Sequence, residues 1–197
     1  MRFCRIGWTG RPELPQLFSA KPATDADITI AFGTGAHPTT RLCLSWLDQN
    51  IRPEASVLDY GCGSGILAIA AAKLGAGAVV GTDIDPRALD AARSNTQTNG
   101  VLASYTDPDR LTPRATFDIV LANILSNPLK LLAPALLNRV APGGSLVLSG
   151  ILDRQTEEVI AAYRTADAAV PLSVWRCQDG WACLAGSRAV PVVPIEH

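Results

Sequence analysis

The stretch SVLDYGCGSGILAIAAAKLG, from Ser56 to Gly75, constrains the fold more than any other part of the sequence. SVLDY predicts a short buried strand, GCGSG predicts a tight turn, and ILAIAAAK predicts a helix rich in strong helix formers. A strand that leads through a glycine-rich turn into a helix is the first half of a unit in which two parallel strands are joined by a helix. The sequence therefore favours an α/β fold with a parallel sheet.

Strands and helices continue to alternate along most of the chain. Further strands are predicted at 78–84, 102–105, 117–123 and 145–151, and further helices at 39–49, 85–100, 127–140 and 154–166. Residues 172–187 predict two strands joined at Asp179-Gly180, a dipeptide typical of hairpin turns. This order predicts a doubly wound, mostly parallel seven-stranded sheet of the Rossmann-like kind, with a C-terminal antiparallel hairpin.

Local signals indicate where several elements begin, bend or end. Asp85 is expected to cap the helix that follows it, and Thr39 or the residue before it is expected to cap the helix at 39–49. Pro134 is a candidate kink in the helix at 127–140. The sequence APGG predicts a turn before the strand that begins at residue 145.

Composition excludes several classes of protein. With 48% hydrophobic and 18% charged residues among 197, the chain is expected to fold as one domain at 31–197 after a proline-rich N-terminal arm at 1–30. The net charge of −1 and the scattered Lys and Arg indicate no direct nucleic-acid partner, and no apolar run is long enough to cross a membrane. Five cysteines without a C-x-x-C pair, and only two histidines, indicate reduced thiols, no structural zinc and a cytoplasmic location.

The glycine loop is predicted to bind an adenosine-type cofactor. Gly61, Gly63 and Gly65 let a ligand approach the backbone closely, and the helix that follows offers unpaired N–H groups. Asp83 ends the second strand, roughly 20 residues further on, where an acidic residue accepts hydrogen bonds from both hydroxyls of a ribose. Without Asp83, the loop would also be compatible with an ordinary turn between a strand and a helix.

Two features weigh against a nicotinamide dinucleotide as this cofactor. The loop has the pattern G-x-G-x-G rather than G-x-G-x-x-G, and Asp59 lies two residues before its first glycine. The charge of Asp59 would repel a pyrophosphate, whereas it suits the ammonium group of an amino-acid cofactor. S-adenosylmethionine carries such an ammonium and a cationic sulfonium, and it has no phosphate, so it is the favoured cofactor.

Together these segments resemble a class I S-adenosylmethionine-dependent methyltransferase. VLDYGCGSG resembles the first motif of that class, GTDIDP the second, FDIVLANIL the fourth strand, and APGGSLVLSG the turn and strand that follow. With AFGTGAHPTTRLCL included, the stretch 31–186 resembles more narrowly the ribosomal protein L11 methyltransferase family. The resemblance is specific because methyltransferases in general lack the GTG-x-HPTT segment.

The loop pattern and this resemblance together imply a set of site residues. The residues expected to contact the cofactor are Thr40, Asp59, Gly61, Gly63, Asp83 and Asn123. Asn123 is also the expected catalytic residue, because its side-chain carbonyl at the end of the fourth strand would accept a hydrogen bond from an incoming amine. Two alternatives stay open: Asn123 only caps the next helix, and Thr40 only caps its own. His37 either shapes the substrate entrance or is a solvated loop histidine, and Cys62 is expected to fill space in the loop rather than react.

The activity that the resemblance implies is N-methylation of lysine and α-amino groups of ribosomal protein L11. The methyl group leaves a charged sulfonium, so alignment provides most of the catalysis, and no dedicated general base is evident. Family members carry an additional N-terminal domain that recognises the substrate, whereas only residues 1–30 precede the resemblance here. The chain is accordingly expected to be either a catalytic-domain fragment or a short homologue. Methylation of another protein or a small molecule, a non-catalytic cofactor-binding module and, more distantly, an oxidoreductase stay open as alternatives.

Overall fold

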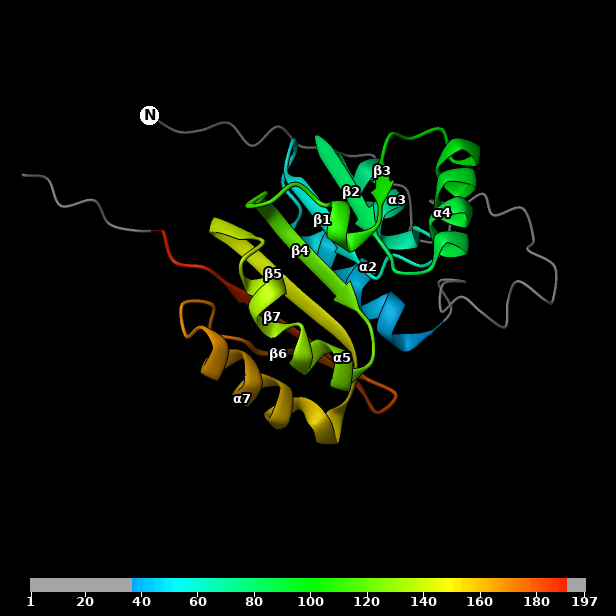
Figure 1. The fold of residues 1–197 in the computed structure, drawn as a ribbon. Helices are drawn as coiled ribbons and strands as arrows, with labels where there is room; N and C mark the ends of the chain where they lie inside the picture. The colour runs from blue at the N-terminus through cyan, green and yellow to red at the C-terminus, as the bar shows by residue number, and fades with distance from the viewer. Residues whose placement is uncertain (1–36, 191–197) are drawn as a thin grey trace, which may run out of the picture.

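The structure, a computed structural model, describes residues 37–190, which form a seven-stranded sheet with helices on both faces (Figure 1). The predicted arm at 1–30 lies outside the described residues, as do Cys4 and the part of the GTG-x-HPTT segment that precedes His37. The predicted domain boundary at residue 31 therefore stays a prediction.

The elements follow the predicted alternation of strands and helices. The strands are β1 (Ser56–Tyr60), β2 (Ala78–Thr82), β3 (Ser104–Thr106), β4 (Phe117–Asn123), β5 (Val140–Leu152), β6 (Ser173–Gln178) and β7 (Trp181–Ser187). The α-helices are α2 (Pro38–Asn50), α3 (Ile66–Lys73), α4 (Pro86–Thr98), α5 (Ser126–Leu131), α6 (Ala133–Leu137) and α7 (Thr156–Ala166). Two short 3-10 helices, η2 (Pro108–Arg110) and η3 (Asp153–Gln155), precede β4 and α7.

The sheet has the strand order β3-β2-β1-β4-β5-β7-β6. Strands β1 to β5 pair in parallel, with Leu58 of β1 opposite Val80 of β2 on one side and Val120 of β4 on the other. Strand β7 runs antiparallel between β5 and β6, so the predicted doubly wound sheet with a C-terminal antiparallel hairpin is confirmed. The strand order reverses direction between β1 and β4, and sheets of this kind bind ligands at the carboxyl ends of the strands beside such a reversal.

The central strands are apolar on both faces because helices cover both sides of the sheet. In β4, Ile119 and Leu121 pack into a core with α2, α3 and α4, whereas Val120 and Ala122 pack into a second core with α5, α6 and α7. Figure 1 shows α5 in front of the sheet and α2 behind it. Alternate side chains of one strand therefore anchor two helical layers, which fixes the strand ends relative to the helices.

The predicted hairpin turn is confirmed at Asp179-Gly180. Both residues have positive φ, 52° and 76°. Two consecutive residues at positive φ are what a type I′ turn requires, and its twist matches that of the flanking strands. The turn brings the first residue of β7, Trp181, opposite Leu152 at the carboxyl end of β5.

The cap predicted for α4 is confirmed, whereas the cap predicted for α2 is wrong. The Asp85 carboxylate accepts a hydrogen bond from the Arg87 N–H at 2.9 Å. Helix α2 is capped by His37, whose Nδ1 accepts from the Thr39 N–H at 3.4 Å, and not by Thr39 or the residue before it. The reason is that an imidazole nitrogen takes over the acceptor role that a hydroxyl or carboxylate oxygen usually fills.

Two predictions around Pro134 and the segment APGG also need correction. The helix predicted at 127–140 is divided into α5 and α6, because Pro134 has no N–H to donate and its ring crowds the preceding turn. APGG lies within β5 as a bulge rather than forming a turn ahead of it: β4 pairs Phe117 with Val140 and next pairs Ile119 with Ser145. The extra β5 residues between these pairs bulge out of the ladder.

Candidate functional site

A cavity of about 410 Å³ opens at the carboxyl ends of the strands, beside the reversal in strand order. Its walls come from the ends of β1, β2, β4 and β5, from the first residues of α2, from η2 and α5, and from the start of β7. The cavity is mostly apolar, and the side chains with polar atoms along it belong to His37, Thr39, Tyr60, Asp83, Asn123 and Trp181. A mostly apolar cavity with a few convergent polar groups is typical of a site for a small organic ligand.

The loop between β1 and α3 carries Gly61, Gly63 and Gly65, all at positive φ (76°, 53° and 79°). The Gly61 N–H donates to the Thr82 carbonyl at 2.7 Å, and the Gly63 N–H donates to the Asp83 carboxylate at 2.9 Å. The end of β2 therefore holds the loop in place, and Gly61 and Gly63 line the cavity, while their contact with a cofactor stays a prediction.

Asp83 and Ile84 form the wall of the cavity that follows β2. The Asp83 carboxylate accepts the Gly63 N–H on Oδ2 at 2.9 Å and the Asp85 N–H on Oδ1 at 3.0 Å. These bonds orient the carboxylate, and each oxygen keeps a lone pair for a further donor. Ile84 is 83% exposed although it is large and apolar, and it lines the same cavity. An oriented acceptor pair beside an apolar surface suits a ribose and the base attached to it.

Asn123 lies at the end of β4 and contacts Thr40 of α2. The Asn123 Nδ2 donates to the Thr40 Oγ1 at 3.4 Å, which leaves the amide oxygen to meet a donor from the cavity. Helix α5 begins after Leu125 with no side-chain cap, so the alternative that Asn123 caps the next helix is wrong. Thr40 is fully buried and does not line the cavity, whereas its neighbour Thr39 does.

Asp59 lies behind the glycine loop and not among the residues that line the cavity. Its carboxylate is 1% exposed and accepts the N–H of Ala68 in α3 at 3.1 Å. Burial raises the pKa of Asp59 to about 7; the Ala68 N–H acts in the opposite direction, and the nearby charge of Asp83 raises the pKa further. The contact that the structure assigns to Asp59 is therefore with α3, and its contact with an ammonium group stays a prediction.

Replacing Asp59 with asparagine is expected to remove a pH dependence of stability. Because the pKa of Asp59 rises from 3.8 to about 7 on folding, the folded protein keeps a proton that the unfolded chain releases in this window. The contribution of Asp59 to the free energy of unfolding is thus fully present below pH 3.8 and is lost as the pH rises through about 7. The loss is on the order of 4 kcal/mol. Urea unfolding across this window should show the loss in the wild type and not in Asp59→Asn. Asp90→Asn, an exposed change on α4, is the control, and parallel profiles for Asp59→Asn and the wild type would contradict a raised pKa.

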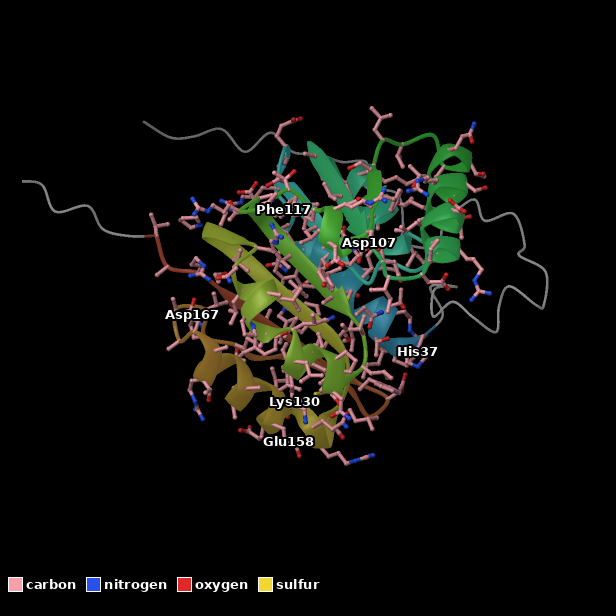
Figure 2. All side chains as sticks on the ribbon, in the orientation of Figure 1. His37, Asp107, Phe117, Lys130, Glu158 and Asp167 are labelled. Atoms are coloured by element: carbon pink, nitrogen blue, oxygen red, sulfur yellow. The ribbon has the colours of Figure 1, made fainter. Side chains whose placement is uncertain are left out.

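His37 and Trp181 meet at the wall of the cavity, although they come from opposite ends of the described sequence. Their rings pack edge to face with centroids 4.9 Å apart, and both residues line the cavity. The His37 Nδ1 also lies 2.8 Å from the Thr39 Oγ1. Figure 2 labels His37 at the start of α2. His37 is thus a packed cap residue at the cavity, which contradicts the alternative of a solvated loop histidine.

Sequence reasoning missed several cavity residues and correctly excluded one. Those missed include Thr39, Tyr60, Ile84, Gly150 and Trp181. For Tyr60 and Ile84, adjacency to the glycine loop and to Asp83 was a usable signal. No local signal marks Trp181, because only the hairpin brings it to the carboxyl ends of the parallel strands. Cys62 is 5% exposed and its pKa is raised by burial, which supports its role as a loop filler.

Within residues 37–190, no cluster of side chains suited to hold a metal ion is present. The described helices include none that is long and apolar enough to cross a membrane. Four cysteines of the described part are free thiols: Cys43, Cys62, Cys177 and Cys183.

Comparison with known proteins adds the following relatives. The family model described as ribosomal protein L11 methyltransferase matches residues 20–189. The ribosomal protein L11 methyltransferase of Cupriavidus metallidurans is 58% identical over 173 residues, which cover 88% of this chain and 55% of that protein. The protein of the same name from Ralstonia pickettii is 59% identical over 164 residues, covering 83% and 54%. The chain spans about half the length of the curated relatives it matches.

Two solved structures extend this comparison. The ribosomal protein L11 methylase of Lactobacillus delbrueckii subsp. bulgaricus superposes with a TM-score of 0.71 at 33% identity, covering 79% of this chain and 81% of that one. A T. thermophilus 16S rRNA methyltransferase in complex with AdoMet and guanosine gives a TM-score of 0.64 at 21% identity, covering 80% and 45%. At that identity the second likeness concerns the fold alone.

Proposed function

This chain belongs to the ribosomal protein L11 methyltransferase family, and from that premise we propose that it is an S-adenosylmethionine-dependent N-methyltransferase. The proposed acceptors are lysine and α-amino groups of ribosomal protein L11, the substrate in the names of its relatives. One observation carries the proposal: a single cavity places Asp83 and the glycine loop beside Asn123 at the reversal of the strand order. A ribosomal protein as substrate also supports the cytoplasm as the proposed location.

The residues of the cavity fit S-adenosylmethionine. Asp83 would accept hydrogen bonds from the ribose hydroxyls, Ile84 would cover a face of the adenine, and Gly61 and Gly63 would let the amino-acid part lie against the backbone. The absence of side chains at the two glycines leaves that approach open. When bound, this cofactor supplies a methyl group on a cationic sulfur, which an amine can take up without further activation of the leaving group. We retain Thr40 and Asp59 as proposed cofactor residues, acting from just behind the cavity wall.

The protein's part in the reaction is to select and orient a neutral amine. A free lysine has a pKa of roughly 10.4, so it arrives mostly as an ammonium ion and must lose a proton before it can attack. The mostly apolar lining disfavours the charged form of an entering amine, and the proton can leave to water. The Asn123 carbonyl, aimed by the contact of its nitrogen with Thr40, would hold a remaining N–H and direct the lone pair toward the methyl group.

Two other functions are distinguished by the acceptor. If the acceptor is not L11, the protein is a methyltransferase of another protein or of a small molecule. If it transfers a methyl group to no amine, it is a non-catalytic cofactor-binding module. Both deserve a test because this chain covers 55% of the length of a relative such as the Cupriavidus protein.

Calorimetric titration with S-adenosylmethionine, followed by transfer of a tritiated methyl group to purified L11, tests the proposal. Binding with transfer is the expected result. Binding without transfer to L11 would reject the proposed acceptor, and a screen of other amines would then separate the two alternatives. Absence of binding would reject the cofactor site itself. NAD in place of S-adenosylmethionine is the control ligand, and no heat of binding is expected for it.

A further inference from the structure

The backbone that follows β4 at the cavity, beside Asn123, is held between two glycines. Residues 123–125 leave β4 and cross the cavity wall between Gly61 of the glycine loop and Gly150 of β5. A Cβ on Gly61 would lie 2.5 Å from Cγ2 of Ile124, the end of a side chain that can rotate away. A Cβ on Gly150 would overlap the carbonyl oxygen of Ile124 and lie 2.7 Å from its carbonyl carbon. Gly150 therefore meets backbone, which has no such freedom.

A bulge in β5 creates this contact. Strand β5 pairs Leu148 with Leu184 of β7 and next pairs Ile151 with Ala182, so one extra residue of β5 lies between these pairs. Gly150 falls in this gap at φ 82°, one residue after Ser149, which pairs with Asn123 of β4. The bulge thus turns the Gly150 Cα toward the Ile124 peptide where β4 ends.

The hydroxyl of Ser149 anchors the same bulge from the other side. Its Oγ donates to the Ala182 carbonyl of β7 at 3.0 Å, and Ser149 is fully buried. Ala182 follows Trp181, which lines the cavity. The bulge therefore links the end of β4, which carries Asn123, to the start of β7.

We propose that Gly150 is a positioning residue for methyl transfer: it sets the position of Asn123 and of the adjoining Ile124 backbone relative to the glycine loop. This inference rests on the proposed function. Although Gly150 lines the cavity, it acts in this scheme through the Ile124 peptide and not through contact with the amine or the cofactor. A side chain at this position displaces Asn123 from the line between amine and methyl group, while Asp83 and the glycine loop keep their places.

The test compares Gly150→Ala with Gly143→Ala. Gly143 is a matched control because it lies in the same strand at φ 75°, and a Cβ there meets only Cγ2 of Val190 within 4 Å, at 3.1 Å. Both variants carry the strain of an alanine at positive φ, whereas Gly150→Ala alone displaces the cavity wall. For Gly150→Ala we expect kcat to fall about 100-fold, the scale of an ångström-sized misplacement. Calorimetry should show its affinity for S-adenosylmethionine within about threefold of the wild type, and Gly143→Ala should keep both values.

A second readout separates this inference from the proposed function. The amide NMR resonances of the Asn123 side chain and of Leu125 should shift in Gly150→Ala and not in Gly143→Ala, while those of Gly63 and Asp83 stay in place. If the wild type transfers no methyl group, the proposed function fails, and these shifts still decide whether Gly150 positions the segment. Unmoved resonances, a wild-type kcat in Gly150→Ala, or a loss of cofactor affinity equal to the loss of kcat would each overturn the inference.

A milder variant covers the case in which Gly150→Ala does not fold. Ser149→Ala removes the bond to Ala182 and keeps Gly150. The loosened bulge should lower kcat about fivefold, the equivalent of one hydrogen bond, without changing the affinity for S-adenosylmethionine. An unfolded Gly150→Ala together with a wild-type kcat in Ser149→Ala would overturn the inference.

Discussion

Replacing Asn123 with alanine is expected to lower kcat about 100- to 1000-fold, the cost of losing one preorganised hydrogen-bonding group at a reacting centre. The amide oxygen is the group that would orient the amine, because the amide nitrogen contacts Thr40 at 3.4 Å. The affinity for S-adenosylmethionine should stay within about fivefold of the wild type, since Asp83 and the glycine loop are untouched. Tritiated-methyl transfer at saturating acceptor measures kcat, and calorimetry measures the affinity.

Thr40→Val and Thr40→Ser are the companion variants for this result. Valine keeps the shape of the buried Thr40 side chain and removes the acceptor for the Asn123 nitrogen, so kcat should fall about tenfold, or roughly 1.4 kcal/mol. Serine keeps the hydroxyl and should restore most of kcat. If Asn123→Ala instead weakens cofactor binding as much as it slows transfer, then Asn123 binds the cofactor only and does not orient the amine.

Replacing Asp83 with alanine is expected to weaken S-adenosylmethionine binding about 100-fold, or roughly 2.7 kcal/mol, because two charge-assisted hydrogen bonds to the ribose are lost. The same change removes the acceptor of the Gly63 N–H at 2.9 Å, so the glycine loop loses a support as well. The rate of methyl transfer at saturating cofactor should fall much less than the affinity for S-adenosylmethionine, since Asn123 and the residues around it are intact. Calorimetry of the variant against the wild type measures the effect.

Asp85→Ala is the matched control for Asp83→Ala. Asp85 lies two residues further on, caps α4 through the Arg87 N–H, and does not line the cavity. Its loss should lower stability slightly by removing the helix cap, and it should leave the affinity for S-adenosylmethionine unchanged. An Asp83→Ala variant that binds S-adenosylmethionine as well as Asp85→Ala does would rule out Asp83 as the ribose acceptor.

The order of the elements was predictable because each has a local cause. Asp85 caps α4 within its own turn, and Asp179-Gly180 adopts the positive φ values that its residue types favour. The alternation of apolar runs with helix formers then leaves few topologies, since crossovers between parallel strands have a fixed hand. The division of the helix at 127–140 was missed, although Pro134 marked the position, because a proline allows either a kink or a break.

The candidate site was predictable only in part. Gly61, Gly63 and Asp83 were identified because their spacing along one strand–loop–helix–strand unit already implies their proximity. Thr40 and Asp59 illustrate the limit of such patterns: both are close to the site, and both are buried behind its wall. Burial depends on what packs over a residue, which no local pattern contains.

The sequence by itself determined the α/β order, the doubly wound sheet and the proximity of Gly61, Gly63 and Asp83, because short-range turn chemistry, hydrophobic periodicity and the spacing within one strand–loop–helix–strand unit encode them. Only the tertiary structure decided how the rest of the cavity is built. The contact between Asn123 and Thr40, the packing of His37 on Trp181, and the place of Gly150 against Ile124 join segments that are distant in sequence. These contacts depend on strand register, because a shift of one residue would turn the side chains of a strand to the other face of the sheet, and the contact of Gly150 depends on a bulge as well.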